Sequence, residues 1–463
     1  MPLRGVPRDV VELMPRVRGW LESLVSSPSV SLPGHPTGPV HATADLVSAQ
    51  FREAGADLVE IIDIPGGHPL VRARLHGPPD APTVVLYAHY DVQPATERQS
   101  WATDPWTLRE GDDGRWYGRG VADDKSGVAM HLAAVALLRD APPVSLEIII
   151  EGEEETCSHL GSVIDRTRAA EADAIVVADL GPPRVGIPAL TTSLRGVAAC
   201  TVEVRTLEHD VHSGQLGGVA PDALQALIMT LSSLYGPDGA VDIPGLTTDI
   251  TTTPDRGTDL GGGAAWARRA AAVLPGAGLL AEADFLDRLS SGPAITVIGL
   301  DVPRPAEASN VVLARAGAKL SLRTAPRADA GAELAVLAEF LRSRCPSWAT
   351  VTVDAVRAAP GWTARRGGRL RDLARVALEE TYGSSVLELG SGVSIPAVRL
   401  LERTAPRAEL ILWGPQDTER ANIHGADESL NPDELARMIT AQVAFLASIT
   451  RHEAGIRATR KEA

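Results

Sequence analysis

The segment Thr83-Val-Val-Leu-Tyr87 is a short apolar run, rich in β-branched residues, that ends in a polar loop. This pattern is typical of a buried strand. Lys125 to Arg139 lacks proline and is rich in Ala, Leu and Val, which predicts a helix. Two more buried strands are predicted at Leu146-Glu-Ile-Ile-Ile150 and Ala174-Ile-Val-Val-Ala178. Strands and helices that alternate in this way indicate an α/β fold with a mostly parallel sheet.

Polar residues that can bind metals or move protons follow three of these strands. His89 follows the first strand, Glu154 and Glu155 follow the second, and Asp179 follows the third. Ligands of such sheets gather beyond the carboxyl ends of the strands. We therefore expect these side chains to meet at one edge of the sheet.

The pattern changes from about residue 191 onward. Val197 to Val204 alternates like a half-buried antiparallel strand, and Asn310 to Thr324 alternates again. In the second segment the apolar positions of period two are Val312, Ala314, Ala316, Ala318, Leu320 and Leu322. Helices are predicted at 221–235 and 330–342, and a strand at 348–356, which together indicate an α+β unit. After Ala359-Pro-Gly-Trp362 the chain returns to a helix, 369–382, and a buried strand, 409–413.

Composition narrows the class of protein. The chain has 463 residues, of which 44% are hydrophobic and 22% charged, so it can bury a sizeable core over more than one domain. A net charge of -15 argues against nucleic acid as a partner. No run approaches the ~20 apolar residues of a membrane span. Three cysteines and an N-terminal segment interrupted by charges predict neither a disulfide framework nor a signal peptide, so we expect a reducing, cytoplasmic setting.

Three motifs carry the candidate chemistry: His89-x-Asp91, Asp123-Asp124-Lys125, and Glu151-Gly-Glu-Glu-Glu155. Each has an ordinary structural interpretation when taken alone: a structural histidine, a helix N-cap, and a solvated acidic turn. Taken together in an α/β context they indicate a two-metal hydrolytic site. Neutral imidazole and ionised carboxylates bind the metals, and a further carboxylate takes a proton from water.

The chain resembles the dizinc peptidases that include carnosinase, Xaa-dipeptidases, glutamate carboxypeptidase and acetylornithine deacetylase, and it is most similar to their dipeptidase branch. The resemblance covers essentially the whole chain. The motifs that carry it are H-x-D-V-Q-P at 89–94, G-R-G-x-x-D-D-K at 118–125, E-G-x-E-E at 151–155, D-x-H-S-G at 210–214 and N-x-H-G at 422–425.

The resemblance implies a ligand set for two zinc ions, with manganese or cobalt as alternatives. The implied ligands are His89, Asp123 as the bridge, Glu155, Asp179 and His424. Glu154 is implied as the general base, Asp91 as the residue that orients His89, and a cis peptide bond is expected after Asp123.

The resemblance also implies a division of the chain and a partner. Residues 1–192 and 362–463 would form the catalytic domain, and 193–361 an inserted lid and dimerisation domain. In a homodimer His212 would stabilise the oxyanion in the partner's active site, although it could simply cap the turn at Ser213. The implied substrate-binding residues are Asn310, Arg323, Gly392 and Ser394. Arg323 could also be an ordinary surface charge.

The expected function is hydrolysis of dipeptides or short peptides, because Asp at position 179 tends to accompany this branch of the family. The alternative is an N-acyl-amino-acid deacylase or carboxypeptidase with the same metal site. A catalytically silent binding protein would be expected to lose the base or a ligand, and all are present. This sequence departs from the family at Cys157, where relatives usually have Gly, and at Val393, which replaces the second Gly of the substrate loop. The segment directly after Trp362 also lacks the histidine that carnosinase-like enzymes have near the substrate.

Overall fold

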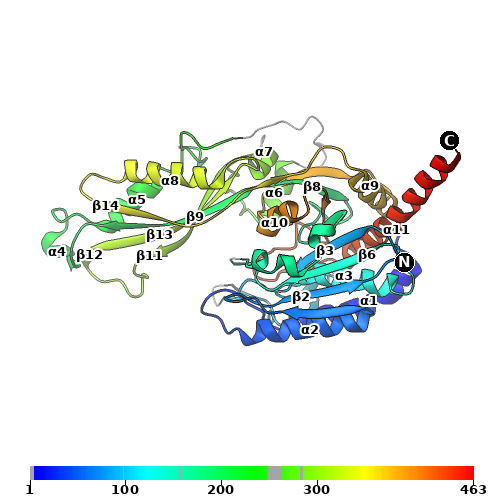
Figure 1. Cartoon of the computed structure of the whole chain (residues 1–463). Helices are drawn as coiled ribbons and strands as arrows, with labels where there is room; N and C mark the ends of the chain where they lie inside the picture. Colours follow the sequence, from blue (N-terminus) through cyan, green and yellow to red (C-terminus); the bar gives the residue numbers. More distant parts are fainter. Residues whose placement is uncertain (1–4, 97–98, 157, 249–262, 282–284, 463) are drawn as a thin grey trace.

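The computed structural model describes residues 5–96, 99–156, 158–248, 263–281 and 285–462, with side chains described as far as residue 449. Figure 1 shows an elongated molecule in which a larger sheet lies at one end and a smaller sheet at the other. Two segments connect the two parts, so the smaller sheet is formed by the middle of the chain.

The larger sheet has the strand order β1-β2-β6-β3-β7-β17. Its strands are β1 (Leu58–Ile62), β2 (Leu70–Leu75), β3 (Thr83–His89), β6 (Ser145–Glu151), β7 (Ala174–Val177) and β17 (Glu409–Leu412). Strands β6, β3, β7 and β17 run parallel to one another, whereas β2 is antiparallel to both of its neighbours, β1 and β6. The predicted mostly parallel α/β sheet is confirmed.

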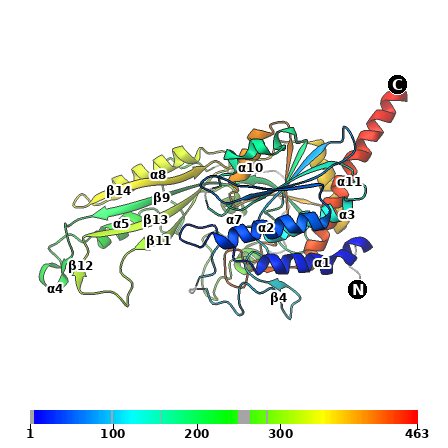
Figure 2. The same cartoon turned by 60° about the horizontal axis from the view of Figure 1, so that its bottom comes forward.

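Helices cover both faces of this sheet, which is why its inner strand β7 is apolar and buried at every position and β3 is buried from Val84 to His89. One face packs against α1 (Arg8–Val25), α2 (Gly38–Ala54), α3 (Lys125–Leu138), α9 (Arg369–Tyr382) and α11 (Pro432–Glu462). Figure 2 shows α1 and α2 lying in front of the sheet. The other face packs against α10 (Pro396–Thr404) and short 3₁₀ turns at 160–162, 164–166 and 169–171. Along β3, Leu86 faces the first layer and Val85 the second, as the pleat of a strand requires.

The smaller sheet is antiparallel, with the order β11-β13-β9-β14. Its strands are β9 (Gly196–Arg205), β11 (Ala294–Asp301), β13 (Arg315–Thr324) and β14 (Thr350–Ala359), and one face packs against α5 (Ala223–Ser232) and α8 (Ala330–Arg344). The apolar residues expected at every second position from 312 to 322 are all buried. Beyond this sheet lie β10 (Val211–His212), β12 (Val311–Val312) and α4 (Ser213–Leu216). Helices α6 (Ala264–Ala270) and α7 (Phe285–Ser290) lie nearer the larger sheet.

The two connecting segments run side by side. Strand β8 (Ala189–Leu194) leads into β9 and pairs with β15 (Trp362–Thr363), to which the chain returns from β14. A Cβ atom at Gly361 would lie 2.6 Å from the carbonyl oxygens of both Leu194 and Pro326, so this close approach requires glycine. The remaining strands are β16 (Leu387–Ser391), which pairs with β8, and β4 (Arg109–Glu110), β5 (Trp116–Tyr117) and β18 (Ser429–Leu430).

Among the described residues, no helix combines the length and the apolar character that crossing a membrane needs.

Candidate metal centre

The carboxyl edge of the larger sheet collects the candidate residues. His89 is the last residue of β3 and pairs in register with Glu151 at the end of β6. Asp179 follows β7 by two residues, and Asp123 lies two residues before α3. Because β6, β3 and β7 are parallel, their carboxyl ends lie together, and these side chains meet as the strand pattern predicted.

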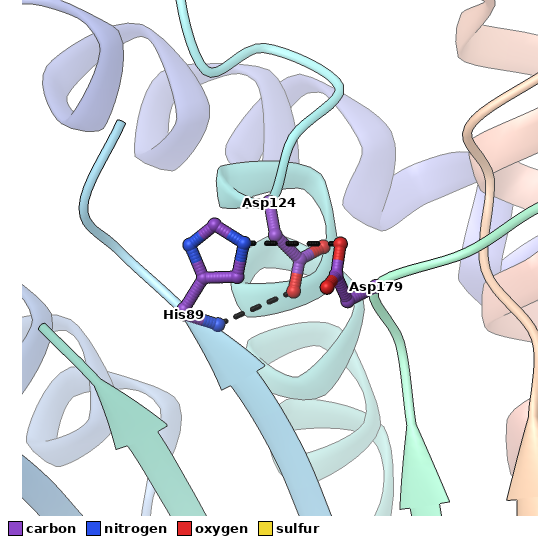
Figure 3. Close-up of side chains that lie close together, drawn as sticks. All are labelled: His89, Asp124 and Asp179. Carbon is purple, nitrogen blue, oxygen red and sulfur yellow. Dashed lines mark hydrogen bonds and ion pairs between the residues drawn. The ribbon is translucent and has the colours of Figure 1, made fainter. Parts of the chain in front are cut away.

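Asp124 supports His89 and at the same time caps a helix. Figure 3 shows the side chains of His89, Asp124 and Asp179 turned toward one another. The His89 backbone N–H donates to Asp124 Oδ2 at 3.2 Å, and His89 Nε2 lies 3.7 Å from Asp179 Oδ1. Asp124 Oδ1 accepts a hydrogen bond of 3.2 Å from the backbone N–H of Gly127, which makes Asp124 the N-cap of α3. Of the two adjacent aspartates, Asp124 is therefore the helix N-cap that the sequence also allowed.

The Asp123 carboxylate lies between two imidazoles. Its Oδ1 is 3.2 Å from His89 Nε2, and its Oδ2 is 3.1 Å from His424 Nε2. His424 Nε2 is also 3.3 Å from Glu155 Oε1. The peptide bond between Asp123 and Asp124 is cis, as expected from the family. The Asp123 carboxylate therefore lies where it can belong to both groups of candidate metal ligands, the one with His89 and the one with His424.

Asp91 holds both the imidazole and the glutamate turn. His89 Nδ1 lies 3.1 Å from the Asp91 carbonyl oxygen and 3.3 Å from Asp91 Oδ1. The two carboxylate oxygens accept the backbone N–H groups of Glu154 and Glu155, each at 3.1 Å, and Oδ2 also accepts the hydroxyl of Ser31 at 2.6 Å. A buried carboxylate with these partners fixes the orientation of the His89 ring.

The electrostatics of the cluster favour a bound cation. Burial and the charge of Asp123 raise the pKa of Asp179 to about 6. Burial, with the charges of Asp179 and Glu155, raises the pKa of Glu154 well above its ordinary value. Although burial acts to lower it, Asp123 and Glu155 raise the pKa of His424 to about 11. The carboxylates therefore repel one another and stabilise positive charge strongly.

The donor atoms fit metal ions. Two groups have ligand atoms within 4.8 Å of one another: His89, Asp124 and Asp179, and Asp123, Glu155 and His424. Glu155 Oε1 is buried and accepts no hydrogen bond, and its close contact is the 3.3 Å approach of His424 Nε2, another candidate ligand. A buried carboxylate oxygen is costly to leave without a hydrogen bond. Imidazole nitrogen with carboxylate oxygen is a donor set that zinc and other first-row divalent ions prefer.

Glu428 is a buried residue that the sequence motifs did not single out. Its carboxylate accepts the backbone N–H groups of Gly120 and Ala122 at 2.9 Å and of Asp123 at 3.0 Å. It also accepts Arg119 Nη1 at 2.7 Å. The Arg119 guanidinium in turn donates to the carbonyl oxygens of His424 and Gly425. This buried ion pair ties the loop that carries Asp123 to the loop that carries His424.

Two glutamines also contact the cluster without having been predicted. Gln93 Nε2 donates to Glu155 Oε2 at 2.8 Å, and Gln416 Nε2 donates to Asp124 Oδ1 and Asp179 Oδ1, each at 3.2 Å. Gln93 lies inside the H-x-D-V-Q-P motif, which could have indicated it. Gln416 follows β17 in a segment with no motif of its own, and only the fold brings it to the site.

A cavity of about 620 Å³ opens beside the cluster. Asp123, Glu154, Glu155, Asp179 and His424 line it, and so do Arg195, Arg323, Arg357, Gly392 and Ser394. Burial lowers the pKa of Arg323, and the charge of Arg357 adds to this effect. Within the part of the chain that the structure describes, neither Arg195 nor Arg323 forms an ion pair with a carboxylate. The cavity wall thus combines the carboxylates of the candidate metal centre with basic side chains.

The loop of Gly392 and Ser394 is tied to the segment that leaves β8. Arg195 Nε donates to the Gly392 carbonyl at 3.0 Å, and the Ser394 hydroxyl donates to the Arg195 carbonyl at 2.6 Å. The serine hydroxyl therefore holds the loop in position.

His212 and Asn310 lie away from this cavity. His212 is exposed on β10, next to Val311 of β12, and its Nδ1 accepts the backbone N–H of Gly214 at 3.0 Å. The Asn310 carbonyl accepts the backbone N–H of Ser213 at 2.9 Å. Figures 1 and 2 both show α4 and β12 at the end of the smaller sheet that is remote from the larger one. One chain therefore does not bring these two residues to its own metal centre. Cys157, one of the positions at which the sequence departs from the family, lies outside the described residues.

A parallel sheet with imidazoles and carboxylates at its carboxyl edge, beside an open cavity, defines a metal-dependent hydrolase. The model of peptidase family M20/M25/M40 matches residues 85–448, and the chain belongs to this family. It is 37% identical to the cysteinylglycine-S-conjugate dipeptidase of Corynebacterium striatum, over 93% of this chain and 95% of the relative. It is 27% identical to the beta-Ala-His dipeptidase of Rattus norvegicus, over 92% and 87%.

Among solved structures, the di-peptidase Dug1p from Saccharomyces cerevisiae matches with a TM-score of 0.86 at 22% identity, over 97% of this chain and 99% of that one. The predicted family, the predicted α/β fold and the predicted class of enzyme, a metallopeptidase, are confirmed.

Proposed function

We propose that the protein is a dipeptidase that requires two metal ions, zinc by default. The observation that carries this proposal is the cavity, whose wall contains the carboxylates and the His424 imidazole of the metal centre together with three arginines. A dipeptide has a free amine near its scissile bond and a free carboxylate one residue beyond it. The names of the relatives that match along the whole chain, both dipeptidases, support the same substrate class.

Each proposed ligand has a position in the cluster that fits this role. His89 and Asp179 would hold one ion, Glu155 and His424 the other, and Asp123 both. When bound, the ions would supply Lewis acidity toward the scissile carbonyl and lower the pKa of water toward ~7. Manganese and cobalt suit the same donors, so the metal in the cell depends on availability as well as affinity.

Glu154 is the proposed general base. Its side chain lines the cavity, and Asp91 holds its backbone N–H. In this position Glu154 would accept a proton from the attacking water and donate it to the leaving amine. Asp91 would keep the His89 ring in place through its contacts with His89 Nδ1. Arg323, whose planar guanidinium offers two parallel donors, would bind the substrate carboxylate together with the loop of Gly392 and Ser394.

We also propose a homodimer in which residues 193–361 form a lid and dimerisation domain inserted between 1–192 and 362–463. His212 and Asn310 are exposed far from their own cavity, and His212 Nε2 is free of the hydrogen bond that occupies Nδ1. In a dimer the partner's cavity would receive them, and the imidazole would stabilise the oxyanion.

A cytoplasmic location is part of the proposal. Cys200 and Cys345 are free thiols, which suits a reducing compartment.

A hydrolysis screen tests the function. The metal-free protein is loaded with zinc, manganese or cobalt and assayed with dipeptides, tripeptides and N-acetyl amino acids. We expect dipeptides with free termini to exceed their N-acetylated and C-amidated forms in kcat/KM. Faster turnover of N-acetyl amino acids than of every dipeptide would replace the dipeptidase with the deacylase.

A further inference from the structure

Three large apolar side chains line the cavity and are nevertheless exposed. Leu289 is 40% exposed, Val393 44% and Ile423 36%. They come from α7, from the loop after β16, and from the residue before His424. We call these three residues the apolar strip.

The apolar strip is attached to well-fixed parts of the site. Leu289 Cδ1 lies only 3.1 Å from the position that a Cβ atom would take at Gly392, so this leucine packs against the substrate loop. The Val393 carbonyl accepts the backbone N–H of Arg195 at 3.1 Å. Ile423 precedes His424 directly, and the carbonyl of His424 accepts the side chains of Gln99 and Arg119. Hydrogen bonds therefore hold the backbone at Val393 and directly after Ile423 in place beside the cavity.

The strip lies in a cavity whose wall also carries charge of both signs. Glu154 and Asp179 contribute carboxyl groups to this wall, and Arg195 and Arg323 contribute guanidinium groups. A volume of about 620 Å³ is within the range of pockets that bury a drug-sized ligand. A dipeptide without side chains could pair its termini with these charged groups but would leave the apolar strip in contact with water.

We propose that the apolar strip binds an apolar side chain of the substrate, so that the preferred substrates are dipeptides with a bulky apolar residue. This inference rests on the proposed dipeptidase function. Val393 is central to it, because it is the most exposed of the three side chains and lies between Gly392 and Ser394 in the loop that is proposed to bind the substrate. Burying the apolar surface of the strip and of the substrate side chain against each other would favour substrates with a bulky apolar residue.

The test compares isosteric polar variants of the strip with a matched variant elsewhere. Leu289→Asn and Val393→Thr keep the approximate shape of each side chain and remove its apolar character. Val11→Thr is the control, because Val11 is 43% exposed on α1 and does not line the cavity. The zinc-loaded enzymes are assayed with Leu-Gly, Gly-Leu, Ala-Gly and Gly-Ala.

We expect the wild type to prefer leucine over alanine in one of the two pairs, and that pair identifies the residue of the dipeptide that contacts the strip. Leu289→Asn and Val393→Thr should each lower this leucine-to-alanine ratio of kcat/KM by about 10-fold, since a lost methylene contact in such a pocket has at least this effect. Val11→Thr should leave the ratio unchanged. Hydrolysis with no leucine preference, or with ratios unaffected by both strip variants, would overturn this inference alone. Absence of hydrolysis of all four dipeptides would overturn the proposed function and this inference with it.

Discussion

Replacing Glu428 with glutamine tests whether this residue keeps the metal centre assembled. In the wild type one carboxylate oxygen accepts the N–H groups of Ala122 and Asp123, and the other accepts Gly120 and Arg119. Glutamine has one oxygen and one amide nitrogen, so one of these pairs of donors loses its acceptor.

The magnitude follows from the burial of the group. Glu428 is fully buried, and Arg119 is 1% exposed. Removing one charge from a buried ion pair costs roughly 3–5 kcal/mol, because the remaining charge stays uncompensated in the interior. Residues that orient metal ligands in this way typically change metal affinity by about 10- to 100-fold. We therefore expect Glu428→Gln to lower the free energy of unfolding by ~3–5 kcal/mol and to weaken metal binding by about 10- to 100-fold.

The assay separates these two effects. Urea unfolding of the metal-free protein measures stability, and competition with a chelator measures metal affinity in the folded protein. Glu434→Gln is the control: Glu434 is also fully buried and accepts the Gly186 N–H at 2.9 Å and the Tyr382 hydroxyl at 2.6 Å, but it lies on α11 away from the metal centre. It should lower stability and leave metal affinity unchanged. If Glu428→Gln binds metal as tightly as the wild type, Glu428 has no part in positioning the ligands.

Four further outcomes are expected. Glu154→Gln should retain its metals and lose about 10²- to 10⁴-fold in kcat, as removal of a general base does; normal turnover by the metal-loaded variant would exclude this role. Mixing inactive Glu154→Gln with inactive His212→Ala subunits should restore part of the activity, and failure despite demonstrated subunit exchange would mean that His212 does not serve a partner. Arg323→Ala should lower kcat/KM for a dipeptide by about 10- to 100-fold, the value of a charge-assisted hydrogen bond, and should affect the C-terminal amide far less; equal losses would refute carboxylate binding. Burial lowers the pKa of His131 to about 4, below its unfolded value of about 6.5, so stability should fall by at most ~3 kcal/mol as the pH drops from 6.5 to 4. In chelator, His131→Gln should show a shallower fall than the wild type, and identical slopes would contradict the assignment.

Much of the fold was predictable because its signals are local. A parallel strand that is buried on both faces must be apolar on both, and Val84 to Tyr87 is. A half-buried antiparallel strand alternates, and the alternation between 312 and 322 matches the burial of β12 and β13. The antiparallel pairing of β1 with β2 was not predicted, because pairing depends on contacts between segments and not on the pattern within one.

The candidate metal residues could be recognised because each follows a strand or belongs to a motif. His89 and Asp91 are two residues apart, and Glu154 and Glu155 are adjacent, so their chemistry is visible in the printed sequence. His424 was found only through its motif, since no local periodicity connects it with Asp123.

The residues around the metal ligands were decided by tertiary structure alone. Glu428 supports Asp123 from a loop some 300 positions later in the chain, and the apolar strip joins Leu289, Val393 and Ile423 from three separate elements. An isolated Glu, Leu or Val has no sequence signal for such a role, because hydrogen bonding and burial depend on which backbone groups and side chains the fold brings near. The sequence therefore determined the sheet, its polar edge and the kind of chemistry. Only the packing of distant segments decided what holds that edge in place, which surface a substrate side chain meets, and that His212 lies far from its own metal centre.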